Sequence, residues 1–429
     1  MKFKPYSKYK ESGIEWLGEV PEHWIALKVG RDMSFMVGWT PSTSNESYYE
    51  NGEYPWVSIE DMKGRYVSKT KKKLTKKAIL EKNAKPVPKG SVLFSFKLSV
   101  GKVAFAKNDL YTNEAIASFL PSKNISSDFF YYLAPLFIPK YGRNNLYDAL
   151  LMNQELIASA KTLVPLYEEQ VLIANYLDRE TTRIDSLIKE KENFIALLKE
   201  KRQALISHTV TKGLDPTVKM KDSGVEWLGD VPEHWSVKKV KHIFEIRKRI
   251  SGELGHPVLS ITQQGVKVKD IVSGKGQLSM DYSKYQFVEV GDFAMNHMDL
   301  LTGYVDLSKF HGVTSPDYRV FSLIDNESID SYYLYLMQMG YKNKIFFSLG
   351  QGVANVGRWR LQTESFNEFN IPYPNRNEQK QIADFLDKQT TKINLLVKET
   401  QTSIELLKEH RTALISAAVT GKIDVREVA

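Results

Sequence analysis

The sequence contains no cysteine in its 429 residues. Without cysteine, neither a disulfide nor a zinc site held by thiolates can form, so the composition fits a reducing cytoplasm better than secretion. No uninterrupted apolar run is long enough to span a bilayer, and the charged stretch 1–12 is not followed by an apolar segment. We therefore expect a cytoplasmic protein that is neither exported by a classical signal nor inserted in a membrane.

Motifs of enzymatic chemistry are missing as well. The Gly-Lys pairs that begin at Gly101, Gly274 and Gly421 lack the upstream glycine and the following Ser or Thr of a phosphate-binding loop. There is no His-Glu-x-x-His, no Gly-x-Ser-x-Gly and no Asn-Pro-Pro-aromatic loop for adenine methylation. The two repeating histidines, His23 and His234, stand in Glu-His-Trp turns, where packing or capping explains them better than metal binding. We expect no catalytic residue, no metal and no cofactor.

The clearest positive feature is an internal repeat. The string SGIEWLGEVPEHW at 12–24 returns as SGVEWLGDVPEHW at 223–235, a shift of 211 residues. A second string, EEQVLIANYLDRETTRIDSLIKE from Glu168, returns as NEQKQIADFLDKQTTKINLLVKE from Asn377, a shift of 209 residues. This period is far longer than that of a solenoid unit, so each copy is expected to be a whole domain with a helix.

Two bodies of different sequence lie between the repeated strings. In the first, roughly 30–163, the apolar runs 92–100 and 102–106 are typical of strands, and FFYYLAPLF near Phe129 is typical of a short helix. The second, about 240–370, has the same order of elements with few residues in common. The repeated strings are alike and the bodies between them differ, as expected if the two bodies recognise different targets. Neutral drift of exposed loops is the alternative explanation.

The residues after each body predict long helices. Apolar residues recur at heptad spacing through 177–205 and through 386–414, as a stripe wider than a coiled-coil seam. Thr182 followed by Asp185 resembles a capping box, which predicts that a fresh helix runs from there to about Thr211. About 27 residues would span ~40 Å, slightly more than one ~34 Å turn of DNA. The two stripes can bury each other as an antiparallel pair, or each can pack on its own body.

Positive charge is concentrated in one segment. The chain has 59 basic and 51 acidic side chains, a net charge of +8. Between Asp61 and Lys107, fourteen basic residues stand against two acidic ones, a local surplus of +12. Such a segment would neutralise several phosphates in a salt-sensitive way, whereas a solvated lysine-rich surface is the alternative.

Candidate base-reading side chains lie in glycine-containing segments of both bodies. In the major groove, Arg and Lys pair with guanine, and Asn and Gln pair with adenine. Ordinary loop residues are the alternative for each one taken singly. The candidate DNA-binding residues are Lys69, Lys71, Lys72, Lys73, Lys76, Lys97, Ser99, Lys102, Arg143, Asn144 and Asn145 in the first body, and Gln263, Gln264, Asn296, His297, Gln351, Asn355, Arg358 and Arg360 in the second.

Four strings occur in the same order in both halves. They are E-W-L-G-x-V-P-x-H-W (15–24 and 226–235), the body ends V-P-L-Y and I-P-Y-P (164–167 and 371–374), E-Q-x-x-I-A-x-[YF]-L-D (169–178 and 378–387) and L-L-K-E-x-R-x-A-L-I-S (197–207 and 406–416). Together they resemble the specificity subunit of type I restriction-modification systems, over nearly the whole chain.

This resemblance implies an α+β fold with two mixed α/β target-recognition domains in tandem, separated by long helices that pair as an antiparallel coiled coil. It implies a non-catalytic DNA-binding subunit in which each domain reads one half of a bipartite double-stranded target, while the helices set the spacer between the halves. The expected divisions are 1–165 for recognition domain 1, 166–213 for helical spacer 1, 214–372 for recognition domain 2 and 373–429 for helical spacer 2.

The resemblance also implies partners. Adenine methylation would belong to modification (methyltransferase) subunits that dock on the repeated helices, two of them if both docking surfaces are used, and cleavage to ATP-dependent restriction subunits that join through the complex. One departure is that the second body has no counterpart of the lysine run 69–77, which puts an equal division of phosphate contacts in doubt. The implied partner-binding residues are Glu169, Gln170, Asp178, Arg183, Glu378, Gln379, Asp387 and Lys392.

Two other classes of function stay open at this point. A coiled-coil adaptor that binds no nucleic acid would leave gel shifts negative even at low salt with the modification partner present. A self-contained methyltransferase or nuclease would need a cofactor loop that the sequence lacks, and a methyl-donor assay on the isolated chain would detect it.

Overall fold

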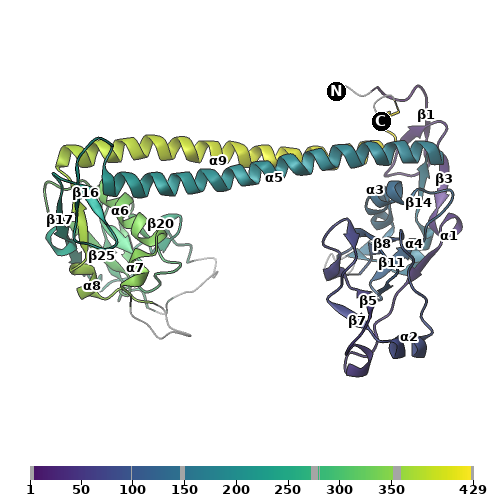
Figure 1. The fold of residues 1–429 in the computed structure, drawn as a ribbon, viewed down its shortest axis with the longest axis horizontal. Helices are drawn as coiled ribbons and strands as arrows, with labels where there is room; N and C mark the ends of the chain where they lie inside the picture. Colours follow the sequence, from purple (N-terminus) through teal and green to yellow (C-terminus); the bar gives the residue numbers. More distant parts are fainter. Residues whose placement is uncertain are drawn as a thin grey trace. The chain divides into compact units, whose positions relative to one another are not determined.

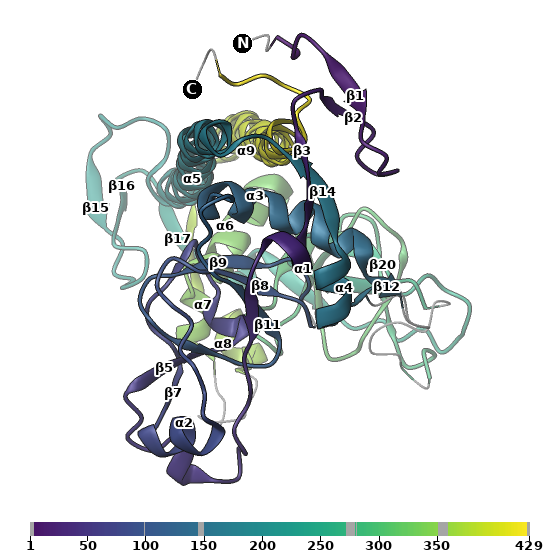
Figure 2. The same cartoon turned by 90° about the vertical axis from the view of Figure 1, so that its right-hand side faces the viewer.

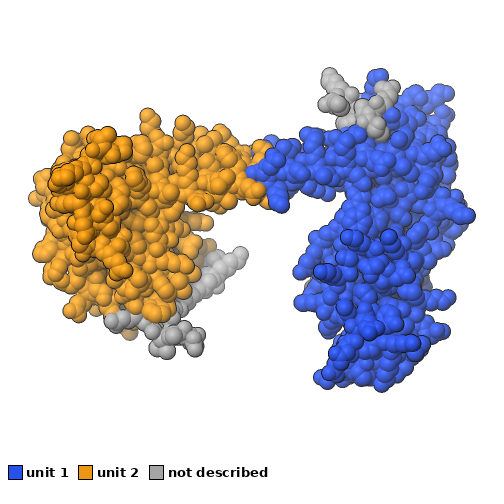
Figure 3. Space-filling model, in the orientation of Figure 1, with its two compact units in different colours: residues 1–190, 403–429 blue, residues 191–402 orange. Residues whose placement is uncertain are grey.

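The computed structural model describes residues 4–426, apart from 98, 145–149, 272–278, 280 and 351–358. The chain forms two compact units, coloured separately in Figure 3: unit 1 contains 1–190 and 403–429, and unit 2 contains 191–402. Two long helices, α5 (Tyr167–Lys212) and α9 (Arg376–Val419), continue past these divisions. Each unit therefore contains one body together with a segment of each long helix.

A five-stranded sheet forms the centre of unit 1, in the order β4-β11-β8-β9-β6. β8 pairs antiparallel with β9 and β11, and β6 pairs parallel with β9 at one edge. Every residue of β8 and β11 is buried, and helix α3 packs against β8 and β9. The predicted strands and the short helix near Phe129 are thus confirmed. The bounds are α1 Val29–Asp32, β4 Phe35–Val37, β6 Tyr66–Val67, β8 Val92–Ser95, β9 Val103–Ala106, β11 Ile116–Phe119, α3 Ser127–Phe137, β12 Arg143–Asn144, β13 Leu150–Leu151 and α4 Gln154–Ser159.

A smaller sheet, β10-β5-β7, supports a lysine-rich segment of unit 1. Helix α2 begins after Thr75, whose side chain accepts a hydrogen bond from the backbone N–H of Ala78, and ends at Asn83 in the left-handed conformation. We call residues 68–85 the lysine lobe. Both views place α2 at the end of unit 1 that lies away from α5 (Figure 1, Figure 2). The bounds are β5 Tyr54–Val57, β7 Lys72–Leu74, α2 Lys76–Lys82 and β10 Tyr111–Thr112.

The repeated string at the entrance of each body folds the same way twice. A hairpin, β1–β2 in unit 1 and β15–β16 in unit 2, is followed by a fully buried tryptophan, Trp24 or Trp235. The next strand then pairs antiparallel with the strand that ends the body, β3 with β14 and β17 with β26. The bounds are β1 Tyr9–Glu11, β2 Glu19–Pro21, β3 Ile25–Lys28, β14 Lys161–Val164, β15 Met220–Asp222, β16 Asp230–Pro232, β17 Ser236–Lys239 and β26 Asn370–Tyr373.

Unit 2 contains a four-stranded antiparallel sheet, β18-β25-β22-β23, with helix α6 packed against β23. The rings of Phe244, Phe293 and Phe321 contact one another in its core, with centroids 5.2 Å apart. Two antiparallel pairs, β19–β20 and β21–β24, complete the body. The bounds are β18 Phe244–Arg247, β19 Leu259–Thr262, β20 Gly265–Val268, β21 Gln286–Val288, β22 Phe293–Met295, β23 Val305–Leu307, β24 Gly312–Thr314, β25 Arg319–Leu323, α6 Asp330–Lys342, α7 Ile345–Ser348 and α8 Thr363–Asn367.

Segments of α5 and α9 lie side by side in each unit (Figure 1). In unit 1, Arg411 Nε of α9 lies 2.9 Å from Asp185 Oδ1 of α5. In unit 2, Val210 of α5 and Ile382 of α9 belong to the same buried core. Later positions of one helix therefore meet earlier positions of the other, so the helices run antiparallel. The two apolar stripes bury each other, as well as packing on the bodies.

The predicted helix boundary at Thr182 is wrong. α5 runs without a break from Tyr167 to Lys212, and Thr182 is exposed in its interior. An N-cap needs free backbone N–H groups, but burial of Ile173 and Leu177 extends the first helix into the second, so no free end remains. The helix is about 69 Å long rather than ~40 Å. It ends before Gly213, as predicted, where the backbone is left-handed at φ 80°.

Candidate nucleic-acid interface

Exposed lysines cover the lysine lobe. Two of its ammonium groups lie against aromatic rings: Lys72 Nζ is 5.5 Å from the ring centroid of Tyr49, and Lys77 Nζ is 5.8 Å from that of Tyr48. These rings hold the lysine stems without neutralising the charge. Lys71 contacts Glu60 at 3.0 Å, an exposed pair that water screens. The candidates Lys69, Lys71, Lys72, Lys73 and Lys76 are all exposed there.

Two cations of the basic segment have roles inside unit 1 instead. Arg65 makes a bidentate pair with Asp178 of α5, with Nη1–Oδ1 at 2.5 Å and Nη2–Oδ2 at 2.9 Å, and its guanidinium lies 5.2 Å from the ring centroid of Tyr131. Lys102, a candidate DNA contact, is half-buried and donates from Nζ to the carbonyl of Ile59 at 3.1 Å. Arg65 thus fastens the body to the long helix, and part of the local charge surplus is structural.

One of the other candidates of the first body lines an open hollow of about 570 Å³ with a mixed polar and apolar lining. Lys97 lines it, and the nearby Ser99 is exposed. Arg143 and Asn144 are exposed on β12, and Asn145 lies outside the described residues. The structure adds four polar lining residues that the sequence-based prediction missed, and the polar run Asn-Gln-Glu was the signal that could have found three of them. The added residues are Glu114, Asn153, Gln154 and Glu155.

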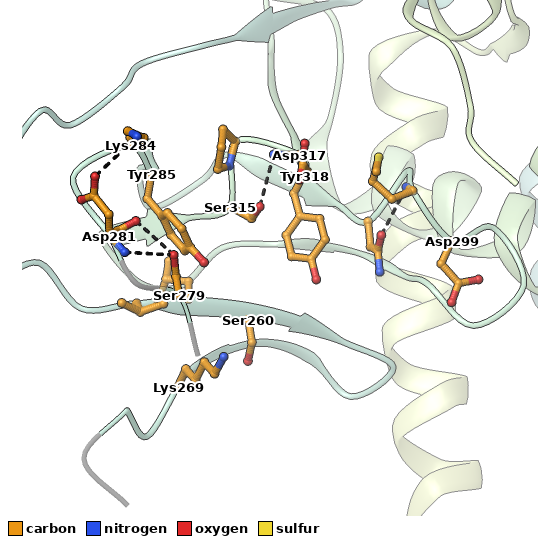
Figure 4. Close-up of a pocket in the computed structure, with 15 residues that line it drawn as sticks. Ser260, Lys269, Ser279, Asp281, Lys284, Tyr285, Asp299, Ser315, Asp317 and Tyr318 are labelled. Carbon is orange, nitrogen blue, oxygen red and sulfur yellow. Dashed lines mark hydrogen bonds and ion pairs between the residues drawn. The ribbon is translucent and has the colours of Figure 1, made fainter. Parts of the chain in front are cut away.

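In unit 2, a second hollow of about 680 Å³ lies beside the β19–β20 hairpin. Ser260 and Lys269 lie across it from the rings of Tyr285 and Tyr318, and the candidate Asn296 also lines it (Figure 4). The exposed candidates Gln263 and Gln264 occupy the hairpin turn, where Gln263 Nε2 donates to the carbonyl of Thr302 at 3.2 Å and Lys267 Nζ donates to Gln264 Oε1 at 2.5 Å. Unlike side chains therefore line the hollows of the two units.

Two further candidates of the second body are brought together by backbone hydrogen bonds. Leu361 N–H donates to the carbonyl of His297 at 3.0 Å, and Leu300 N–H donates to the carbonyl of Trp359 at 3.2 Å. Arg360 lies between Trp359 and Leu361 in the chain, and its side chain is exposed. Burial, followed by the charges of Arg319 and Arg360, lowers the pKa of His297 to about 4, so its imidazole is neutral at pH 7. The candidates Gln351, Asn355 and Arg358 lie outside the described residues.

The first two implied partner-binding positions of each helix contact the chain's own body. Glu169 accepts hydrogen bonds from Tyr6 Oη at 2.8 Å and Trp24 Nε1 at 3.3 Å, and its Oε2 lies 2.7 Å from His23 Nε2. Its counterpart Glu378 contacts His234 at 3.0 Å. The glutamines that follow repeat one pattern: Gln170 and Gln379 each accept from a backbone N–H at the start of α3 or α6 and donate to the carbonyl of a proline.

The aspartates further along the helices also repeat a single contact. Tyr132 Oη donates to Asp178 at 2.7 Å, and Tyr335 Oη donates to Asp387 at 2.6 Å. The two remaining positions, Arg183 and Lys392, are exposed. Six of the eight side chains thus anchor a body to a helix, and their binding of a partner stays a prediction.

Within the described ranges, no three His, Asp or Glu side chains gather in a way that could hold a metal ion. Among those same residues, every helix is too polar or too short to pass through a bilayer.

The model of the type I restriction modification DNA specificity domain matches the chain twice, over residues 36–196 and 232–406. This chain belongs to the type I restriction-modification specificity subunit family. Its two matches include both bodies with their hollows, so it is a specificity subunit with two DNA-recognition domains.

Curated relatives agree with this assignment. The MjaVIII specificity subunit of Methanocaldococcus jannaschii is 23% identical over 98% of both chains. The MjaIX specificity subunit of the same organism is 32% identical, but the match covers only 31% of each chain, so less than a third of that relative's length. The EcoR124I/EcoR124II specificity subunit of Escherichia coli is 27% identical over 42% of this chain and 44% of its own.

Two solved structures share the fold. A chain from a study of complex assembly and conformational transition in the type I R-M system aligns with a TM-score of 0.68, at 12% identity, over 93% of this chain and 98% of its own. The HsdS subunit from Thermoanaerobacter tengcongensis aligns with a TM-score of 0.54, at 13% identity, over 94% and 98%. The predicted fold class, two mixed α/β domains in tandem with paired long helices, is confirmed.

Proposed function

We propose that this chain directs a restriction-modification complex to a bipartite double-stranded DNA target, with one half read by each recognition domain, and that it performs no catalysis itself. The observation that carries this proposal is the contrast between scaffold and hollows. The anchors of Glu169 and Glu378, of Gln170 and Gln379, and of their aspartates are alike in both units, whereas the hollows have different linings. Two similar scaffolds that carry different side chains at their hollows suit the recognition of two different half-site sequences.

The polar chemistry supports a division of labour within each domain. The residues at the hollows include Lys97 and Gln154 in unit 1 and Asn296 in unit 2, and such side chains can discriminate base edges in the major groove. The lysine lobe presents more lysines than the two carboxylates that pair with them, Glu60 with Lys71 and Glu81 with Lys77, and this surplus suits phosphates and contributes salt-dependent affinity. In this proposal 1–165 and 214–372 are the recognition domains, and 166–213 with 373–429 are the helical spacers.

The long helices would set the number of unread base pairs between the half-sites. A continuous helix is a rigid spacer, and its pairing with a second one stiffens it further. The methyltransferase subunits would dock on the repeated stretches 169–183 and 378–392, which offer two equivalent surfaces and thus suit two copies. ATP-dependent restriction subunits would join through that complex.

The test is an exchange of one body. Replacing residues 30–163 by the corresponding body of a relative should change one half of the methylated sequence and leave the other half unaltered. Sequencing of adenine methylation in cells with the gene, without it and with the exchanged gene reads the result directly. A change in both halves, or a methylation pattern that does not depend on the gene, would overturn the proposal.

A further inference from the structure

Arg319, the first residue of β25, is a cation in the interior of unit 2. Only 4% of the surface of Arg319 is exposed to solvent. Nη2 donates to the carbonyl of Leu361 at 3.0 Å and to Thr363 Oγ1 at 3.3 Å, and the guanidinium lies 4.5 Å from the ring centroid of Phe366. Nη1 is buried and finds no hydrogen-bond partner among the described residues. A guanidinium this deep is ordinarily paired with a carboxylate, because an uncompensated buried charge opposes folding.

No carboxylate of the described residues pairs with Arg319; Asp299, two residues after His297, is the acidic group whose charge acts with that of Arg319 on Tyr341. The charges that act on His297 come from Arg319 and Arg360, and both lower its pKa. Burial lowers the pKa of Arg319 to about 10, which still leaves the guanidinium protonated at pH 7. His297 is neutral, and its Nδ1 is a second buried atom without a hydrogen-bond partner in the described part of the chain. Two permanent cations and one neutral imidazole thus share a small region.

Three segments that are distant in sequence build this region. Arg319 faces Met295 in the register of β22 and β25, and His297 follows two residues later. The segment from Trp359 to Leu361 is joined to the same loop by two backbone hydrogen bonds. Arg319 holds that segment through Leu361, next to the exposed Arg360. The cluster therefore runs from the protein interior to its surface.

We propose that Arg319, His297 and Arg360 form an anion site that binds a phosphate group, and that its occupant in the assembled complex is a backbone phosphodiester of the DNA. The assignment of the occupant rests on the proposed function. Arg360 contacts the phosphate from the surface, His297 can donate from its Nδ1–H tautomer, and the buried charge of Arg319 is screened by water far less than a surface lysine is. A bound phosphate would supply the negative charge that no carboxylate of the described residues supplies to Arg319.

This site would give the second body a phosphate contact, although that body has no counterpart of the lysine run 69–77. The second body lacks a lysine run, so its phosphate contacts would have to come from few, well-placed groups. Phosphate binding here would also hold the Trp359–Leu361 segment against the loop that carries Asn296. Backbone anchoring and base reading in unit 2 would then occur on adjacent residues.

Thermal unfolding of the full-length chain tests the anion site without DNA. The midpoint temperature is compared in sodium phosphate and in sodium chloride of equal ionic strength, for wild type, Arg319→Met, Arg360→Gln and the control Lys309→Gln, which removes an exposed cation of the same unit. We expect the same phosphate-specific rise in wild type and in Lys309→Gln and a smaller rise in Arg360→Gln and Arg319→Met, because the lysine lobe and the general stabilising effect of phosphate act equally in all four proteins. Arg360 is exposed, so its variant stays folded even if Arg319→Met does not. An unchanged rise in Arg360→Gln, or an equal loss in Lys309→Gln, would overturn the site.

DNA binding in the presence of the modification subunits tests the occupant. For Arg360→Gln we expect uniformly weaker binding across target sequences and a salt slope reduced by about 1, as for the loss of one phosphate contact. Relaxed discrimination at one base position with an unchanged slope would instead make Arg360 a base reader and refute the phosphodiester. Absence of DNA binding by wild type would refute the proposed function, whereas the phosphate measurement would still decide the anion site.

Discussion

At the scale of single residues, the repeat offers matched pairs in which one contact differs. Asp178 accepts from Tyr132 and also pairs with Arg65, whereas its counterpart Asp387 accepts from Tyr335. The side chain of Arg65 is 25% exposed, and removing Asp178 leaves this largely desolvated cation with one exposed carboxylate, Asp128 at 3.2 Å. Asp387 is exposed, and water can replace what it loses.

We therefore expect Asp178→Asn to lower the free energy of unfolding by about 2–3 kcal/mol, because it removes the charge-assisted pair with Arg65, and Asp387→Asn by about 1 kcal/mol, because the asparagine oxygen can still accept from Tyr335. Urea denaturation of the two variants measures both values against wild type. Equal losses would mean that the Arg65 pair adds nothing to the attachment of the first body to α5.

His297 provides a residue-scale prediction for pH. Its pKa is lowered from 6.5 to about 4, chiefly by burial and then by the charges of Arg319 and Arg360. A histidine whose folded pKa is depressed contributes stability that is present above pH 6.5 and is lost as pH falls toward 4, because the unfolded chain takes up the proton first. We expect His297→Gln to be less sensitive to acid than wild type across this window. The measurement is the urea midpoint against pH, with an NMR titration of His297; a midpoint near 6.5 in the folded protein would contradict the prediction.

At the scale of elements, the sequence pattern predicted correctly those helices and strands that depend on interactions between residues close in sequence. The strands near 92 and 103, the helix near Phe129 and the stop before Gly213 follow from nearby residues, and all are found. The false start at Thr182 arose because a capping signal says nothing about whether the preceding turn is buried. Arg319 was missed for a similar reason: its partners Leu361 and Thr363 are more than forty residues away, and only the folded sheet brings them together.

The continuity of α5 at Thr182 can be tested with two substitutions. In a continuous helix Thr182→Ala should leave the free energy of unfolding unchanged or raise it slightly, because alanine is the better helix former at an exposed interior position. Arg183→Pro should cost about 3 kcal/mol or more, because proline removes an interior hydrogen bond. If Thr182 were an N-cap, the alanine would cost about 1 kcal/mol and the proline, at the first helical position, would be tolerated. Thermal and urea unfolding of both variants distinguish the cases.

At the scale of the whole molecule, the repeat assigns different roles to like and unlike segments. The entrance hairpins, the buried Trp24 and Trp235 and the His–Glu contacts of Glu169 and Glu378 recur, so the same elements attach each body to the helices. Trp24 also donates to Glu169, whereas Trp235 Nε1 has no hydrogen-bond partner among the described residues. Base-contacting residues were predicted only as polar candidates, because a hollow is formed by residues from several strands. Gln154 and Glu114 show this, since each lines the first hollow beside Lys97 from a different segment.

If the paired helices set the spacer, lengthening both should lengthen the spacer alone. One heptad inserted after Glu190 in α5 and one after Thr402 in α9 preserves the apolar stripe on both helices, since heptad spacing keeps the buried face in register. Seven residues add about 10 Å of helix, close to three base pairs at about 3.4 Å each. We expect the methylated sequence to gain about three unread positions with both half-sites unchanged. A heptad in α5 only would misalign the stripes and is expected to reduce stability. Methylome sequencing reads the spacer, and an unchanged spacer in a folded, active double insertion would show that the helices do not set it.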